Sequence, residues 1–298
     1  MMLLPENGDP PEQSECGSTD TDTRGNYSLE EFGGKVDYKI EFESDRVKIT
    51  NMLGWSRNHN GPNNLESGWS PTFEYWTESW ANATVLNAAY ECRVQVNKNN
   101  LQTPFPTSFW AGSGNAVNKL NIRIKYDEGT GRMVTKPWSI NEIKIWTDLY
   151  GKQKGTDLLY RVTFHELGHS LHARLGGSMV FATKIIRESW ADFIEHLFIT
   201  AYYPRQKLDS SKQFQTKVNW EDGYTPLFID LMDIENQFSI YGGDRPFDRV
   251  YGYTPLQLQE ALVRNNNLKE IRDDLKRTYS NPKAQYLDEL FDYYLKLE

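Results

Sequence analysis

The chain has 298 residues, of which 38% are apolar and 13% aromatic, and its formal net charge is -8. This aromatic content is typical of a folded protein and excludes a fully disordered chain. The sequence has no basic block, which argues against a nucleic-acid partner, because phosphate contacts need concentrated lysine and arginine. No apolar run approaches the roughly 18 residues of a transmembrane helix, so no transmembrane segment is predicted.

Residues 1–26 are rich in proline, glycine, serine, threonine and aspartate, and we expect them to form a disordered leader. The start lacks the basic segment and apolar core of a signal peptide. Scarce cysteine and abundant asparagine, tryptophan and tyrosine favour a protein that is secreted or associated with the cell envelope, with its export signal absent from this chain; a cytoplasmic location stays open. Cys16 and Cys92 are too few for a disulfide framework, and we do not expect them to pair.

A β-rich region is predicted over 27–110, because apolar and polar residues alternate over 36–42, and 46–50 is a candidate partner strand. Residues 51–80 are rich in aromatic and polar residues without a clean period. They suit either a surface that faces a ligand or an aromatic-rich minor core, and we favour the second. The segment 84–96 fits both a strand and a helix, and we expect a strand in its second half.

Two further strands are predicted over 120–126 and 140–146, directly ahead of a helix over 157–175. Gly155 and Thr156 suit the start of this helix, and Gly176 and Gly177 suit its end. A second helix is predicted from Thr183 to just before Pro204. The chain after Trp220 is mainly helical, with helices expected over 226–236, 255–265, 268–279 and 282–297.

Four of the five histidines lie in one stretch: His165, His169, His172 and His196. The first two belong to the HExxH segment His165-Glu166-Leu167-Gly168-His169. On a helix, residues four apart differ by about 40° in direction and about 6 Å in height, so both imidazoles can bind one tetrahedral zinc ion. Glu166 then projects beside the metal and can accept a proton from water. The pattern predicts one catalytic zinc ion per chain with Glu166 as general base; the alternative is a helix with two solvated or core histidines.

The third ligand separates two kinds of zinc peptidase. The metzincin pattern HExxHxxGxxH needs glycine at 172 and histidine at 175, but this chain has His172 and Leu175. The gluzincin pattern takes a glutamate from the next helix, where Arg187-Glu188-Ser-Trp-Ala-Asp192 supplies Glu188. Over about residues 156–200 the chain therefore resembles gluzincin-type zinc metallopeptidases, in the thermolysin-like arrangement. This resemblance implies that the zinc ligands are His165, His169 and Glu188.

The resemblance also implies a role for Asp192, one turn past Glu188: its carboxylate accepts the other N–H of a ligand histidine and fixes the ring. The alternative is a solvated aspartate. Glu195 shares that helix face and is the reserve candidate for the third ligand. His172 lies about 10 Å along the axis from His165, so we expect it behind the ligands or at the surface rather than on the metal.

Other residues are less constrained by spacing. His196 could orient a substrate or stabilise an oxyanion, but an ordinary hydrogen-bonded histidine is favoured. An oxyanion donor is also needed, and nothing in the spacing chooses among four tyrosines: Tyr202, Tyr203, Tyr224 and Tyr241.

The predicted fold class is α+β and zincin-like, with a mixed β-sheet packed on the HExxH helix and a mainly helical C-terminal half. The predicted division is a leader over 1–26, a β-rich region over 27–110, the catalytic core over 111–205 and a helical subdomain over 206–298. One edge strand of the sheet would bind an extended peptide by backbone pairing.

The predicted function is zinc-dependent hydrolysis of peptide bonds in a peptide or protein substrate, by metal-activated water and a glutamate base. The alternatives are a zinc hydrolase acting on a non-protein or glycan-bearing substrate, and a non-catalytic zinc-binding protein. The sequence makes no prediction of the oligomeric state.

Overall fold

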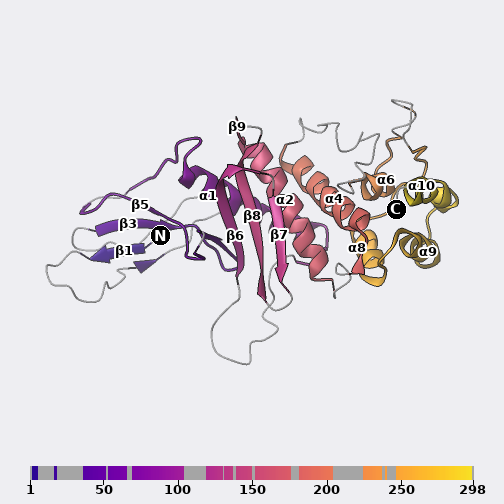
Figure 1. Cartoon of the computed structure of the whole chain (residues 1–298), viewed down its shortest axis with the longest axis horizontal. Helices are drawn as coiled ribbons and strands as arrows, with labels where there is room; N and C mark the ends of the chain where they lie inside the picture. The colour runs from indigo at the N-terminus through magenta and orange to yellow at the C-terminus, as the bar shows by residue number, and fades with distance from the viewer. Residues whose placement is uncertain are drawn as a thin grey trace, which may run out of the picture.

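The computed structural model describes residues 2–5, 17–18, 36–51, 53–65, 69–103, 119–129, 131–136, 139–149, 152–175, 181–203, 224–236, 239 and 246–296. Helices and strands mix along the chain, which confirms the α+β class. Figure 1 shows a small N-terminal sheet, a larger sheet beside it, and then the helices that lead to the C-terminus.

The N-terminal sheet is antiparallel. Its strand order is β2 (Gly17–Ser18), β1 (Met2–Pro5), β3 (Val36–Glu41) and β5 (Asn58–Asn60). Strand β3 confirms the strand predicted over 36–42. The disordered leader expected over 1–26 contains the strands β1 and β2, while its other residues lie outside the described part of the chain.

The larger sheet is mixed. Its order is β4 (Val47–Thr50), β6 (Leu120–Glu128), β8 (Ser139–Leu149) and β7 (Gly131–Lys136), and β9 (Lys152–Gln153) also pairs with β8. The first three strands are parallel, and β7 is an antiparallel edge strand. Buried residues alternate along β4, β6 and β8, as in a sheet covered on one face: Val47, Ile49, Leu120, Ile122, Ile124, Ile143 and Ile145.

Strand β4 corrects two details of the prediction. It was expected to pair with 36–42, but that contact is local, with the Ile49 N–H donating to the Phe42 carbonyl at 2.9 Å. Its main partner is β6. The larger sheet therefore crosses the boundary expected at residue 110, since β4 precedes that boundary and the other strands follow it.

The segment 84–96 lies in a helix, α1 (Glu78–Lys98), so the strand expected in its second half is wrong. Thr77 caps the helix through a hydrogen bond from the Trp80 N–H, at 3.2 Å. Strand-like alternation would bury Tyr90 and Val94, but these side chains are 42% and 40% exposed. The buried residues follow helical spacing instead: Ala81, Val85, Ala88, Ala89, Cys92 and Val96. Burial raises the pKa of the Cys92 thiol, which is free.

The aromatic stretch 51–80 divides into two parts. Trp69 packs on Tyr38 and stacks on His59, with ring centroids 5.6 and 5.8 Å apart, which makes a minor aromatic core. Tyr75 and Trp76 remain 49% and 44% exposed, and their ring centroids lie 4.1 Å apart. The minor aromatic core therefore has a counterpart in the fold, while the ligand-facing surface stays a prediction.

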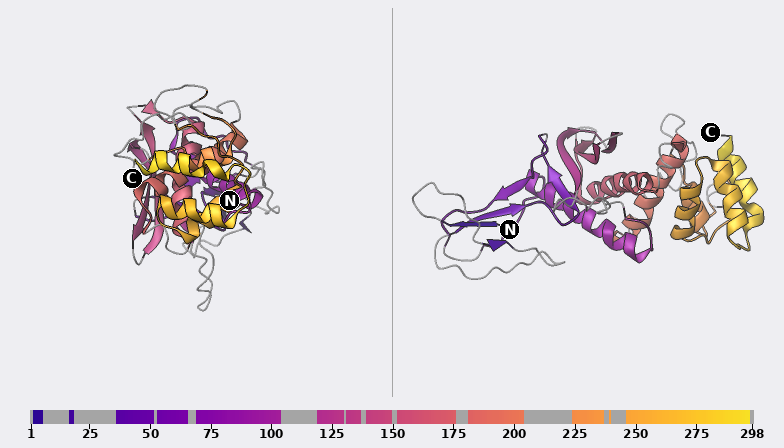
Figure 2. Two further views of the ribbon diagram at one scale, coloured as in Figure 1. Left: turned by 90° about the vertical axis from the view of Figure 1, so that its right-hand side faces the viewer. Right: turned by 90° about the horizontal axis from the view of Figure 1, so that it is seen from below.

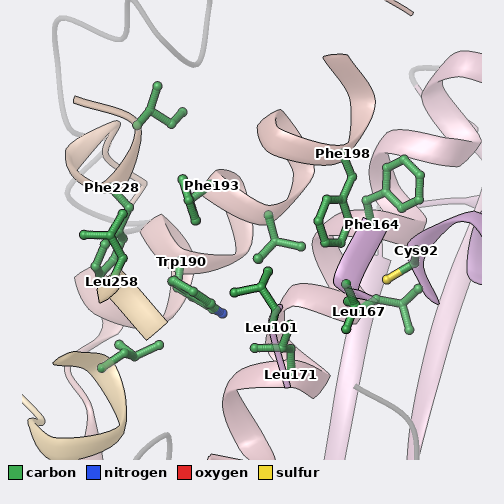
Figure 3. Close-up of a cluster of buried hydrophobic side chains, with 14 of the residues drawn as sticks. Cys92, Leu101, Phe164, Leu167, Leu171, Trp190, Phe193, Phe198, Phe228 and Leu258 are labelled. Carbon is green, nitrogen blue, oxygen red and sulfur yellow. The ribbon is translucent and has the colours of Figure 1, made fainter. Parts of the chain in front are cut away.

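The helix α2 (Thr156–Ala173) packs on β7, β8 and α1, and α4 (Lys184–Tyr202) packs on α2. Their N-caps are Gly155 and Thr183, close to the starts predicted from the sequence. Figure 3 shows the apolar side chains that both helices contribute to one core: Phe164, Leu167, Leu171, Trp190, Phe193 and Phe198. This core fixes the spacing of the two helices that carry the predicted ligands.

The C-terminal part is helical, as predicted, and its last helices lie at the end of the molecule farthest from the N-terminal strands (Figure 2). The helices among its described residues are α6 (Leu227–Met232), α8 (Pro255–Arg264), α9 (Leu268–Thr278), the short 3-10 helix η2 (Ala284–Tyr286) and α10 (Leu287–Leu295). Helix α6 is shorter than the helix expected over 226–236. Among the described residues, no helix is both long and apolar enough to cross a membrane.

Candidate metal centre

The HExxH segment lies in the middle of α2, as predicted. His165 and His169 are 8% and 6% exposed, so both rings are nearly buried and point toward the neighbouring helix rather than to solvent. Their ring centroids lie 4.8 Å apart, and the ring planes are nearly perpendicular. Two imidazoles held this closely on adjacent turns have the arrangement that the spacing predicted.

Gly168, the fourth residue of the motif, lets α4 approach α2 closely. A Cβ atom at this position would lie 2.9 Å from the Cα of Ala191 and 3.1 Å from the Cβ of Ile194. The first distance is shorter than packed carbon atoms tolerate. Glycine here therefore brings the carboxylates of α4 within reach of the two histidines.

The third predicted ligand, Glu188, lies beside both histidines. Its Oε2 atom is 3.2 Å from the Nε2 of His169 and 3.5 Å from the Nε2 of His165. Burial alone would raise the pKa of Glu188, but hydrogen bonds and charge from the two histidines outweigh burial and hold it well below its usual range. The carboxylate is therefore ionised at neutral pH.

These distances fit a tetrahedral zinc site. Ligand atoms about 2.0–2.1 Å from a tetrahedral ion lie about 3.3–3.4 Å from one another. The two nitrogen–oxygen distances of 3.2 and 3.5 Å lie on either side of that value. Two imidazole nitrogens and one carboxylate oxygen are also the donor set of catalytic zinc sites that keep one position open. The residues present therefore fit zinc.

The opposite nitrogen of His165 faces two carboxylates of α4. Its Nδ1 atom lies 3.1 Å from the Oδ1 of Asp192 and 3.5 Å from the Oε2 of Glu195. The Nε of Arg161 donates to the other oxygen of Glu195 at 2.8 Å. Asp192 thus lies on the side of His165 where the resemblance implied it, at ion-pair distance from Nδ1.

Comparisons with protein-family models, with curated proteins and with solved structures found no match. The function must therefore be argued from the site itself.

Glu195, the reserve ligand, does not share the side of His165 on which Glu188 lies. His165, Asp192 and Glu195 do form a second group whose potential ligand atoms lie within 4.8 Å of one another. However, this group has one imidazole, and the Arg161 guanidinium already neutralises Glu195. The group of His165, His169 and Glu188 has two imidazoles and a single carboxylate, so it suits zinc better.

Two neighbours of the site were not singled out from the sequence. Arg161 lies one turn before His165 on α2, so helical spacing could have indicated it. Gly131, the first residue of β7, lies against the carboxylate of Glu166, which is 4% exposed. No local pattern signals that contact, because it joins two elements that are distant in sequence.

The structure distinguishes among the candidate tyrosines. The Tyr224 ring lies 5.8 Å from the His165 ring. The Tyr202 hydroxyl instead donates to the Glu91 carboxylate, and Tyr203 packs on Tyr160. Tyr241 lies outside the described residues, and His196 belongs to neither of the two groups of potential ligands. Tyr224 is therefore the described tyrosine that lies beside the candidate centre.

His172 is fully buried, so the surface position considered for it is wrong. Neither ring nitrogen has a hydrogen-bond partner. Burial, with the nearby His169 and Arg187, lowers the pKa of His172 to about 3. This ring stays neutral at working pH.

Replacement of His172 by leucine is expected to make the metal-free protein more resistant to acid. The unfolded imidazole titrates near 6.5, so the stability of the wild type is full above pH 6.5 and falls as the pH drops toward 3. At about pH 4.5, two units below 6.5, this loss is roughly 3 kcal/mol, and His172→Leu avoids it. Urea unfolding of both proteins at neutral and acidic pH measures the difference. An equal loss in both would contradict the titration of His172.

Proposed function

We propose that the chain is a gluzincin-type, zincin-like zinc metallopeptidase that hydrolyses peptide bonds. One observation carries the proposal: the Nε2 atoms of His165 and His169 lie at tetrahedral ligand spacing from one oxygen of Glu188. Zinc at such a site supplies a Lewis acid that polarises a carbonyl and lowers the pKa of water.

The side chains around the centre have distinct roles in this proposal. Glu166 accepts the proton of the attacking water and passes it to the leaving amine, so no net proton is gained or lost. Asp192, whose Oδ1 lies 3.1 Å from the Nδ1 of His165, is assigned the role of orienting that ring. Burial of Glu166, which is 4% exposed, limits its access to bulk water.

Tyr224 is the residue that we assign to the oxyanion, because its ring lies 5.8 Å from that of His165. Loss of one oxyanion donor typically slows the reaction by about 100-fold to 1,000-fold. Tyr224→Phe is therefore expected to lower kcat on that scale and to leave zinc content unchanged. Tyr203→Phe, which removes the hydroxyl of a ring that packs on Tyr160, is the matched control and should keep full activity. Equal rates for both variants would remove Tyr224 from the mechanism.

A hydrolase that acts on a glycan-bearing substrate is the second candidate. The exposed rings of Tyr75 and Trp76 favour it, because aromatic faces stack on sugars as well as on apolar side chains. Secretion, or association with the cell envelope, stays a prediction from composition.

The test is to measure the zinc content of the full chain and its hydrolysis of casein, of a peptide library and of a glycopeptide set. One zinc per chain with chelator-sensitive peptide cleavage supports the proposal. Cleavage confined to glycopeptides supports the second candidate. Zinc binding without any hydrolysis favours a non-catalytic zinc protein, and failure to bind zinc refutes the centre itself.

A further inference from the structure

The chain crosses over the end of β8 on its way from β6 to β7. Strand β6 ends beside Asp148 of β8, and β7 then runs back along the other side of β8. Gly129 lies in this crossing, where its N–H donates to the Asp148 carbonyl at 3.0 Å. A Cβ atom at Gly129 would lie 2.5 Å from the Cγ of Trp146, so the backbone at Gly129 packs directly against that ring.

A buried lysine fixes the crossing. Lys154 is 2% exposed, and its ammonium group donates to three backbone carbonyls, those of Gly129, Trp146 and Asp148. Its own N–H donates to the Thr147 carbonyl at 2.7 Å. Displacement of this ammonium group would break its hydrogen bonds to the three carbonyls. Leaving a buried polar group without partners costs free energy, so the contacts oppose movement of the backbone. The start of β7 is therefore held in a defined place.

Gly131 is the first residue of β7, and its backbone lies against the side chain of Glu166. A Cβ atom at Gly131 would lie 2.6 Å from the Oε1 of Glu166 and 2.8 Å from its Cγ. It would also lie 2.7 Å from a methyl carbon of Val162. All three distances are well below ordinary contact, so no side chain fits unless both Glu166 and Val162 shift.

We propose that Gly131 is a positioning residue for Glu166. The backbone of Gly131 contacts the Glu166 carboxylate on one side and limits its position. The hydrogen bonds of Lys154 hold the segment just before Gly131 and so keep this contact in place. This inference rests on the proposed function, in which Glu166 must lie within hydrogen-bond reach of water. A general base has to lie about 2.6–3.2 Å from the atom that gives up the proton. A displacement of about 1 Å costs about 100-fold in rate.

The first experiment compares Gly131→Ala with the wild type at full zinc occupancy. The expected result is a fall in kcat of about 100-fold with little change in KM or zinc affinity, because Glu166 moves but is not a ligand. Gly54→Ala is the control, since Gly54 has a φ of +84° and nothing within 4 Å of an added Cβ. That variant strains the backbone just after β4, where Gly54 contacts none of the residues of the candidate centre, and should keep its kcat. Unchanged kcat in Gly131→Ala, or loss of zinc along with activity, would overturn the proposal.

The second experiment does not depend on hydrolysis. In the metal-free protein, Gly131→Ala is expected to lower Tm by roughly 3–6 °C when Glu166 is present. The drop should shrink in a Glu166→Ala background and vanish when Val162→Ala is added, because both crowding groups are then gone. Equal drops in all three backgrounds would show that Gly131 does not press on Glu166. If the wild type hydrolysed no substrate, the proposed function would be refuted. The Tm measurements in the three backgrounds would still show whether Gly131 contacts Glu166.

Discussion

Replacement of Glu166 by glutamine is expected to slow peptide hydrolysis by at least about 100-fold while zinc stays bound. Glutamine keeps the size and the buried position of this side chain, which is 4% exposed, but it cannot accept the proton of the attacking water. General-base catalysis contributes about 100-fold to 10,000-fold, so kcat should fall within that range. Steady-state rates on the best library peptide, measured beside metal analysis of the same samples, give the result.

The control for this variant is Glu78→Gln, an exposed glutamate at the start of α1 whose partner is Arg57. Its activity should equal that of the wild type. A Glu166→Gln protein that retains most of its kcat would show that another group takes the proton. A variant that loses zinc would instead give Glu166 a role in binding the metal, against its place outside the group of His165, His169 and Glu188.

Among the three carboxylates of α4 that lie beside the histidines, Glu188 is expected to be the one whose removal weakens zinc binding most. The Glu188→Ala variant leaves the two histidines without the carboxylate oxygen that lies 3.2 Å from His169 and 3.5 Å from His165. Loss of a residue that only orients a ligand costs about 10-fold to 100-fold in metal affinity. Loss of the ligand itself should therefore cost more than about 100-fold. Competition with a chelator of known affinity measures the change.

Asp192→Asn and Glu195→Gln are matched comparisons, because both alter a carboxylate beside the other nitrogen of His165. Each should weaken zinc binding less than Glu188→Ala does. If Glu195→Gln had the largest effect, the ion would lie on the Nδ1 side of His165. The second group of potential ligands would then be the metal site.

The parts of the site that follow a local period could be predicted from the sequence. The HExxH helix and the next helix each have apolar residues at helical spacing and a capping position, and both form close to the expected residues. The positions of His165, His169 and Glu188 follow once two such helices pack together. The same logic failed for 84–96, where alternation and helical spacing coincide. There the burial of Ala88, Ala89 and Cys92 against the rest of the fold decided the helix.

Features that join distant segments were not predicted, because they have no local pattern. Strand β4 pairs with β6 across a long intervening segment, so its place in the larger sheet has no signal near residue 47. Gly168 and Gly131 look like ordinary glycines in the sequence. Their roles come from the close approach of Ala191 and of Glu166, respectively.

The buried Cys92 thiol has a practical consequence. It lies in α1, within the core that the larger sheet shares with α2, and it is fully covered. A thiol reagent can modify it only when α1 lifts from that core, since burial both hides the sulfur and disfavours the reactive thiolate. In a chain that carries Cys16→Ser, the rate of labelling at Cys92 therefore reports how often this layer opens, with and without zinc.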